Sequence, residues 1–299
     1  MKRESRFAQM NYGILCSSDM KHLKYRILYA CLVLFMVICG LCVLLPVLWM
    51  MLSGFKEPAE LVSKHTSFFP KQIKLSKLGL VWNQMKFYQC YLNTIIMSLG
   101  AVVADVVVNG LAGYVLSRLK PKGSKFYFAL ITTLMMIPGT VSMVPNYMTF
   151  QSFPYLHFSL INTFWPIWMM AAVNMFNILL FKTSFDAISN SLIEAAKIDG
   201  ASSLDIFFRI VIPLSVPVIT TVSLFTFNGQ FGNFFWPYLL VNDKAKEVVG
   251  IKLFNMKSGN FTQDYQLLAV FFSVLPQMLI FALFQKQIVG GINVGGVKG

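Results

Sequence analysis

Residues 27–52 read ILYACLVLFMVICGLCVLLPVLWMML and contain no Lys, Arg, Asp or Glu. A transmembrane helix needs about 20 apolar residues to cross the roughly 30 Å of hydrocarbon in a bilayer, so this stretch is long enough to span a membrane. The basic residues before it also fit a signal peptide, but the apolar region of a signal peptide has only about 7 to 15 residues and ends at an Ala-x-Ala-like site. We therefore expect residues 27–52 to stay in the mature protein as its first transmembrane helix.

The composition of the whole chain agrees with a membrane setting. Of its 299 residues, 56% are hydrophobic and only 12% are charged, whereas about 25% are charged in soluble proteins. A soluble domain of this length would need many more charged side chains to cover its surface. We assign the net charge of +13 to membrane topology and attraction to anionic lipid, and we expect no nucleic-acid partner.

Four more charge-poor stretches supply the remaining spans: 91–116, 126–181, 210–241 and 265–285. The first contains Asp105 as its only charge, and the second is too long for one helix, so we divide it near Gln151–His157. Unpaired strand edges are not tolerated in lipid, and the chain lacks the alternating pattern of a β-barrel. The predicted fold class is an all-α integral membrane protein with six transmembrane helices.

The distribution of Lys and Arg predicts the orientation. Residues 118–125 carry four basic residues and no acid, which favours the cytoplasm for this loop. Six spans then place both termini and the polar loop 184–213 on the cytoplasmic face. The predicted segments are a cytoplasmic N-terminus (1–26), a first helix (27–52), an extracellular loop (53–90), a five-helix core (91–285) and a cytoplasmic glycine-bearing tail (286–299).

Residue types that carry out chemistry are scarce and scattered. The five cysteines and three histidines suggest neither a disulfide framework nor a metal site. Cys39 and Cys42 have the C-x-x-C spacing, but they lie inside an apolar helix without a second ligand pair. A Ser/His/Asp set, a P-loop and a glycine-rich nucleotide fingerprint are all missing. We therefore expect no catalysis, no metal and no cofactor in this chain.

The loop residues 194–213 read EAAKIDGASSLDIFFRIVIP, a polar segment between apolar stretches. Two Ser-x-x-acid spacings predict capping boxes, and thus helix starts, at Ser191 and Ser202. Gly200 should close the first helix, and Pro213 should bend or end the second. The alanines after Glu194 would let a partner's backbone approach closely. The segment is either a docking element or an ordinary capped helix in a loop.

Six residues in this loop resemble the EAA motif of importer permeases in the ATP-binding-cassette superfamily. That motif is E-A-A, three residues, G, nine residues and I-x-L-P, and Ile212 stands where the pattern has Leu. The resemblance implies a type I importer (MetI-like) bundle, in which residues 191–200 form a coupling helix that docks on a separate ATPase. ATP and magnesium would be bound by that partner. The coupling residues it implies are Ser191, Glu194, Ala195, Ala196, Asp199, Gly200, Ile210 and Pro213.

Flanking segments are similar to the second permease of carbohydrate importers of the maltose type. Residues 231–237 are similar to the family's W-N-D-F-L-W-P, and residues 284–299 to its closing F-Q-K and G-x-x-x-G-A-V-K-G, with departures at 231–233 and Gly296. The resemblance implies a prokaryotic plasma membrane, a second permease and two ATP-binding subunits. It also implies an extracellular substrate-binding protein that docks on segments 55–90 and 242–264, and a tail that reaches the ATPases.

Polar residues inside the predicted spans are the candidates for a sugar path, because hydroxyl-rich sugars need hydrogen-bond partners and buried polar residues are costly in lipid. Helix-to-helix hydrogen bonding is the rival role. Breaks at Pro138, Pro145, Pro213 and Pro217 favour a gated path. The candidates are Asp105, Asn109, Asn174, Asn177, Asn228, Gln230 and Asn233.

Three other functions stay open at this stage. A permease for another solute, such as a peptide or phosphate, would share the EAA motif. A secondary transporter or channel should show internal repeats or an ion site, and neither is clear in the sequence. A membrane-anchored scaffold would have no path. The sequence does not name the sugar.

Overall fold

The computed structural model describes residues 23–63, 67–154, 158–256 and 261–292. Within these ranges the chain forms helices and connecting segments, and no strand occurs there. Two compact units are present, the N-terminal unit (residues 1–73) and the C-terminal unit (residues 74–299). The predicted all-α class is confirmed for the described residues.

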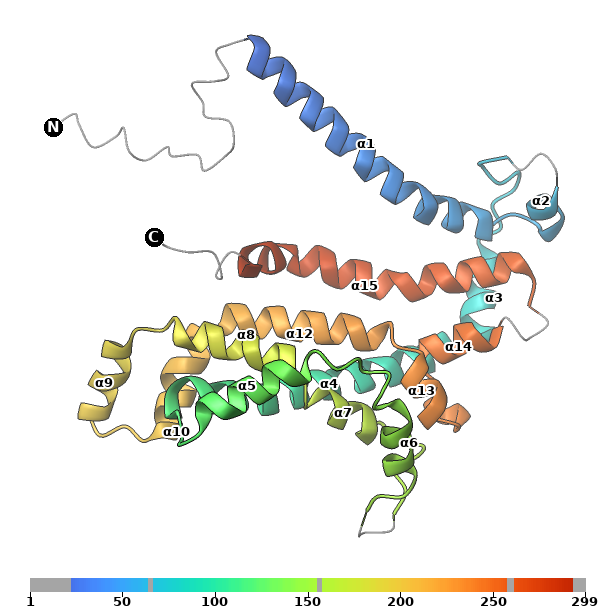
Figure 1. Cartoon of the computed structure of the whole chain (residues 1–299). Coiled ribbons are helices and arrows are strands. Elements are labelled where there is room, and N and C mark those ends of the chain that lie inside the picture. Colours follow the sequence, from blue (N-terminus) through green and yellow to red (C-terminus); the bar gives the residue numbers. More distant parts are fainter. Residues whose placement is uncertain (1–22, 64–66, 155–157, 257–260, 293–299) are drawn as a thin grey trace. The chain divides into compact units, whose positions relative to one another are not determined.

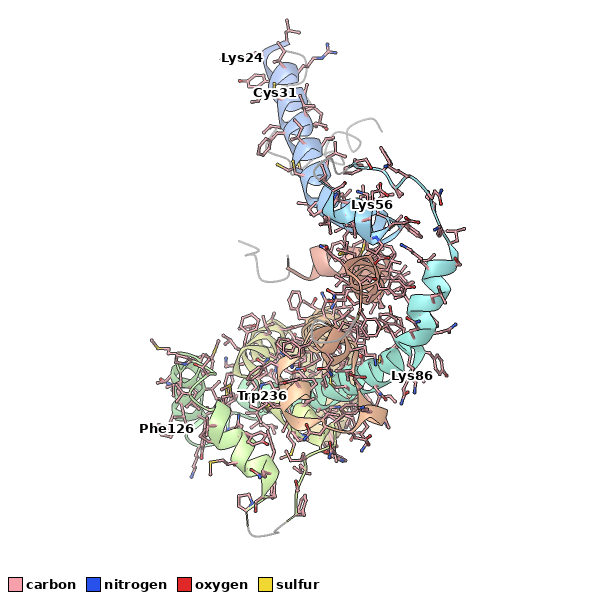
Figure 2. All side chains as sticks on the ribbon, turned by 90° about the vertical axis from the view of Figure 1, so that its right-hand side faces the viewer. Lys24, Cys31, Lys56, Lys86, Phe126 and Trp236 are labelled. Carbon is pink, nitrogen blue, oxygen red and sulfur yellow. The ribbon has the colours of Figure 1, made fainter. Side chains whose placement is uncertain are left out.

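The N-terminal unit is built on one long apolar helix, α1 (Leu23–Gly54) (Figure 1). Its most apolar 18-residue window has a mean hydropathy of 3.0, and none of that window is buried. Lys24 and Cys31 both lie on this helix, whose side chains project on several sides (Figure 2). The first predicted span is therefore confirmed as a helix long and apolar enough to cross a membrane.

Residues 53–90, predicted as an extracellular loop, contain more helix than we expected. Pro58 starts one of these helices at the first helical position, where its missing N–H costs nothing. The long helix that follows begins four residues before the predicted boundary at Tyr91, because its first turn is anchored by the buried Phe87. The helical parts of this region are α2 (Pro58–Val62), α3 (Ser76–Gln84) and the start of α4 (Phe87–Tyr114).

Helix α4 is the centre of the C-terminal unit, where it packs most extensively against α12 and α8. It continues without a break into a five-residue π-helical segment, η3 (Val115–Leu119). Figure 1 shows α4 running beside α7, α8 and α12. The bounds of these three partners are Trp165–Ala171 for α7, Met175–Asp186 for α8 and Val216–Phe231 for α12.

Two glycines let neighbouring helices approach α4 closely. A Cβ atom added at Gly113 would lie 2.6 Å from the Cβ of Phe181 on α8. A Cβ atom at Gly100 would lie 2.2 Å from the ring of Trp168 on α7. Small residues at such crossings are the usual means by which membrane helices pack, since lipid supplies no hydrophobic drive between them.

Helix α15 (Gln263–Ile292) packs against α3, α12 and α14 (Val249–Met256). The Lys77 Nζ of α3 lies 2.7 Å from Asp264 Oδ2 at the start of α15. Trp82, Phe87 and Phe272 form a cluster with ring centroids 5.5 to 5.8 Å apart. The part of this helix that is apolar enough to span a membrane is Gln263–Gln285, and the helix itself continues to Ile292, into the predicted tail.

Two of the predicted spans are bent. The segment Trp165–Asp186 bends by 46° between α7 and α8, and the segment Ser203–Phe231 bends by 76° before α12. The second bend follows Pro213 and precedes Pro217, which confirms the predicted interruption there. The apolar run 210–241 does not form a single helix, because α12 ends at Phe231 and a separate helix, α13 (Phe235–Leu240), follows.

The predicted third span is not a single long helix. It consists of α5 (Ser124–Leu134) and α6 (Met143–Gln151), separated by a segment that contains Pro138 and Gly139. Phe126 at the start of α5 is 68% exposed and lies at the edge of the C-terminal unit (Figure 2). Over the residues that the structure describes, three helices are long and apolar enough to span a membrane, or up to five if each bent pair counts as one span.

Candidate coupling surface and translocation cavity

The segment that carries the EAA motif folds into a short helix, α9 (Asn190–Ile198). Its N-cap is Ser189, and no side chain makes a capping hydrogen bond there. The hydroxyl of Ser191 instead lies 2.7 Å from that of Ser189. The predicted capping box at Ser191 is therefore wrong, since the helix starts one residue earlier and Glu194, its fifth residue, lies exposed beyond the first turn.

The end of α9 and the start of the next helix agree with prediction. Gly200 has a φ of +81°, and its N–H bonds to the Lys197 carbonyl at 3.1 Å while the Ala201 N–H bonds to the Ala196 carbonyl at 2.9 Å. This is the Schellman arrangement, which requires a left-handed residue and so favours glycine. The helix that follows, α10 (Ser203–Ile206), begins with the predicted box, in which Ser202 and Asp205 each bond to the other's backbone N–H at 3.2 Å.

One face of α9 is buried against the helices of the bundle. Ile193 lies in a cluster of buried apolar side chains with Phe185 of α8, and Ala196 packs against it. The cluster continues through a second π-helical segment, η4 (Phe207–Val211), and α11 (Ile212–Leu214), with Ile210 packed on its edge and Pro213 exposed. Its fully buried members are Tyr114, Phe181, Phe185, Ile193, Ile206, Phe207, Val211 and Val222.

The other face of α9 is open. Glu194, Ala195 and Asp199 are exposed, and the apolar side chain of Ile198 is 86% exposed. Figure 1 shows α9 and α10 at one end of the C-terminal unit, beyond the ends of α8 and α12. A single exposed apolar side chain is common at protein surfaces, so what distinguishes this face is that it also carries Glu194 and Ala195 of the EAA motif.

The end of α4 is hydrogen-bonded to the start of α9 through Arg118. Its Nη1 donates to Asn190 Oδ1 at 2.6 Å, and its Nη2 donates to the carbonyls of Phe185 and Ile188. From the sequence, Arg118 served only as a charge that orients the loop, so this role was missed.

Two more contacts join the same end of α4 to α10 and to the end of α8. The Tyr114 hydroxyl donates to the Ser203 carbonyl at 2.9 Å. The Ser117 hydroxyl donates to Asp186 Oδ1 at 2.6 Å, and Lys182 Nζ lies 2.6 Å from Asp186 Oδ2. The helix hairpin of α9 and α10 is thus tied at both arms to the end of α4.

A second polar cluster lies around Asp105, halfway along α4. The side chain is fully buried, and Asn109 Nδ2 donates to its Oδ1 at 2.5 Å. Asn177 Nδ2 of α8 donates to Oδ2 at 2.7 Å, and the Thr226 hydroxyl of α12 donates to the same oxygen. Three helices therefore meet at one carboxylate. This is the helix-to-helix hydrogen bonding that the sequence offered as the alternative to lining a sugar path. Thr226 was missed, since a helical Thr often bonds only within its own helix.

Asn109 and Asn174 satisfy the backbone at the bend between α7 and α8. Asn109 Nδ2 also donates to the Ala171 carbonyl at 3.1 Å, and its Oδ1 accepts from the Asn174 N–H at 3.1 Å. The side chain of Asn174 caps α8 by accepting from the Asn177 N–H at 3.1 Å. Broken helices persist in membranes only where the freed backbone groups find such partners.

A cavity of about 250 Å³ opens beside the Asp105 cluster. The predicted path residues that line it are Asp105, Asn174, Asn177 and Gln230. Asn109 does not line it but bonds the lining residue Asp105. Asn228 is exposed and does not line the cavity, and Asn233 lies outside it but donates to Gln230 Oε1 at 3.2 Å. Over the described ranges, no group of three or more His, Cys, Asp or Glu side chains is placed to hold a metal ion. The full lining is Asp105, Ala171, Asn174, Phe176, Asn177, Phe225, Thr226, Gly229 and Gln230.

The segment predicted to meet an extracellular partner is held firmly at its start. Asn162, which has a φ of 63°, accepts from the N–H groups of Asn242 and Asp243 at 2.6 and 3.0 Å. Asn93 Nδ2 of α4 donates to the carbonyl of Ala245 at 2.9 Å, beside the short 3-10 helix η5 (Lys244–Lys246). Residues 257–260 of this segment lie outside the described residues.

Comparisons with known proteins agree with this arrangement. Residues 109–293 match the family described as binding-protein-dependent transport system inner membrane component. The chain is 32% identical over 257 residues to a probable ABC transporter permease protein of Bacillus subtilis (strain 168), YurM, covering 85% of this chain and 83% of the relative. It is 29% identical over 291 residues to the galactooligosaccharides transport system permease protein GanQ of the same organism, covering 94% and 99%.

The fold is also similar to that of a solved structure. A chain in the crystal structure of a bacterial ABC transporter involved in the import of the acidic polysaccharide alginate superposes with a TM-score of 0.75. The superposition covers 92% of this chain and 99% of the other, at 23% identity. At this identity the likeness concerns the fold, and it includes most of the elements described above.

Proposed function

The chain belongs to the family of binding-protein-dependent transport system inner membrane components, and from that premise we propose that it forms half of the transmembrane path for a sugar or oligosaccharide. It is a transport subunit of an ABC importer, and ATP hydrolysis belongs to a separate ATPase. Support for the solute class comes from the names of relatives, among them permeases for galactooligosaccharides and arabinooligosaccharides.

The observation that carries the proposal is the open face of α9. The EAA residues stand on a helix whose inner face is fixed by Ile193 while Ile198 is left 86% exposed. Burying such a side chain against a partner is worth roughly 1.5 to 3 kcal/mol. In the proposed complex this face sits in the ATPase, and both ends of the chain lie in the cytoplasm.

The proposed assembly has four kinds of component. This chain, with six spans, pairs with a second permease, and two ATP-binding subunits lie below them. An extracellular substrate-binding protein delivers the solute to the outer loops. The third span in this scheme is formed by α5 and α6 together, on either side of Pro138. The termini at residues 1–22 and 293–299 lie outside the described residues.

The cavity beside Asp105 is the proposed path surface of this subunit. Asp105 already accepts three hydrogen bonds, so its role there is to fix the surrounding helices. Gln230 and Asn174 present amides at the cavity, while Phe176 and Phe225 are 50% and 46% exposed at its rim. Amides that bond hydroxyl groups and rings that stack on apolar sugar faces are the groups such a solute needs.

Uptake by cells tests the proposal. A strain that lacks this chain should fail to take up a labelled oligosaccharide from a panel of galactose-, arabinose- and uronate-based compounds, and the wild-type chain should restore uptake. Glu194→Lys reverses a charge on the docking face, and we expect uptake to fall by more than about tenfold, equivalent to about 1.4 kcal/mol of lost coupling.

Glu194→Gln is the matched control, because it keeps the shape of the side chain and removes only its charge. It should retain more uptake than the lysine variant. Normal uptake by Glu194→Lys would contradict the docking role. Uptake of a peptide or phosphate ester that depends on this chain, with no sugar transported, would replace the sugar assignment by the other-solute alternative.

A further inference from the structure

The end of α4 has an unusual backbone. After Tyr114 the helix widens into η3, and the Lys120 N–H bonds back to the Val115 carbonyl at 2.9 Å. Lys120 then ends the helix in the left-handed region, with a φ of 43°. Single π turns are rare in proteins and occur frequently at functional sites. This one carries Ser117, which bonds Asp186 at the end of α8, and Arg118, which bonds Asn190 at the start of α9.

Arg118 joins two helix ends at once. Its Nη2 reaches the carbonyls of Phe185, in the last turn of α8, and of Ile188, two residues past its end, and its Nη1 bonds the side chain of Asn190 at the first position of α9. Carbonyls at the end of a helix lack partners within that helix, and the rigid fork of a guanidinium can satisfy several of them together. A displacement of α9 relative to α8 would therefore pull on this side chain.

The same helix extends to the cavity. Asp105 lies thirteen residues before Arg118 on one continuous helix, a distance of about 20 Å at 1.5 Å per residue. Asp105 is bonded to α8 and α12, and both of these helices line the cavity. Helix α4 thus rigidly connects the hydrogen bonds of Arg118 at α9 to the cavity surface beside the proposed path.

We propose that Arg118 is a positioning residue that passes movement of α9 to α4, and so to the cavity at Gln230. The inference rests on the proposed function, because it requires an ATPase that moves α9. In this role Arg118 leaves docking and ATP hydrolysis intact and determines whether the cavity responds to them.

Cysteine labelling can test this without knowing the solute. Gln230→Cys would be made in a chain whose five native cysteines are replaced by serine, and the complete complex would be purified through a tag on this chain. The labelling rate with a small polar methanethiosulfonate reagent is measured without nucleotide and after trapping with ATP and vanadate. With Arg118 present, we expect the two rates to differ several-fold.

Arg118→Gln should make the two labelling rates equal while ATP hydrolysis stays close to the wild-type rate. Lys122→Gln is the matched control, because Lys122 is an exposed base on the same loop, and its complex should keep the several-fold difference. Asn190→Ala removes one of the three acceptors and should reduce the difference without abolishing it.

The outcomes separate the inference from the function beneath it. A several-fold difference that survives in Arg118→Gln overturns the inference and leaves the proposed function standing. If Arg118→Gln fails to assemble, Asn190→Ala decides: a reduced difference supports the inference and an unchanged one overturns it. Equal rates in the complex that retains Arg118 would overturn the proposed function itself.

Discussion

Helix α4 carries two polar clusters, one around Asp105 and one around Arg118, and they hold the bundle by different means. At Asp105, a buried carboxylate accepts from side chains of α4, α8 and α12. At Arg118, a cation donates mostly to backbone carbonyls at a helix end. The first cluster fixes whole helices to one another along their length, whereas the second fixes a small hairpin to the end of one helix.

The difference teaches where the bundle tolerates movement. A side chain bonded to three helices in the interior cannot shift without breaking several hydrogen bonds, and buried partners left alone cost about 1 to 3 kcal/mol each. The hairpin of α9 and α10 is attached at its arms and through the buried Ile193 and Ile206, while its outer face is exposed. The helices around Asp105 are therefore expected to move together as one body, and the hairpin of α9 and α10 to move more freely.

The largest effect is expected from Asp105→Ala. The substitution leaves the donors of Asn109, Asn177 and Thr226 without their acceptor, and we expect a loss of about 3 kcal/mol or more in the free energy of unfolding. Reversible unfolding in detergent micelles measures it. Asp105→Asn keeps one acceptor oxygen and should lose clearly less. Equal losses in both variants would mean that the bonds contribute little and the side-chain volume dominates.

A middle-sized effect is expected from Gly113→Ala, which tests the packing of α4 on α8 between the two clusters. The new Cβ would lie 2.6 Å from Phe181 Cβ and 3.0 Å from the Lys182 nitrogen, and overpacking of this kind costs about 1 to 3 kcal/mol. Gly110→Ala on the same helix meets nothing within 4 Å and should be neutral or stabilising. The same unfolding assay compares them, and similar losses at both positions would refute the close approach at Gly113.

The smallest effect is expected at the helix caps of the hairpin. Ser202→Ala removes a capping side chain and should lower the local stability of α10 by about 1 kcal/mol. Ser191→Ala should change little, because Ser191 caps no helix. Hydrogen exchange of the amides at residues 203–206 and 190–193 measures both. Faster exchange at 190–193 in the Ser191 variant would show that Ser191 does cap the helix, as the sequence predicted.

Much of the fold and the site was accessible from the sequence because the signals are local. Charge-poor runs predicted α1, α4 and α15, and the glycine at 200 and the box at Ser202 predicted the turn after α9. Charged and amide residues in apolar stretches predicted the cluster around Asp105 and four of the nine residues that line the cavity, since such residues are costly in lipid unless they find partners.

The remaining features depend on contacts between distant residues. Ser189 and Ser191 are both residue types that can cap α9. The helix starts at Asn190, after Ser189, and Arg118 bonds the side chain of Asn190 there. Thr226 and Thr221 look alike in sequence, yet Thr221 bonds its own helix at Pro217 while Thr226 bonds Asp105. The length of α6 was likewise not predictable from Pro138 and Pro145, which mark breaks without fixing where helix resumes.

The bend between α7 and α8 has an electrical consequence. A span broken at Ala172–Asn174 has two dipoles where an unbroken helix has one, and the positive end of the second lies at Asn174, on the lining of the cavity beside Asp105. The carboxylate thus stands near a region of partial positive charge supplied by backbone amides. None of the hydrogen bonds described at Asp105 comes from Lys or Arg. A broken helix thereby lets an apolar bundle keep a buried acid without a side-chain cation bonded to it.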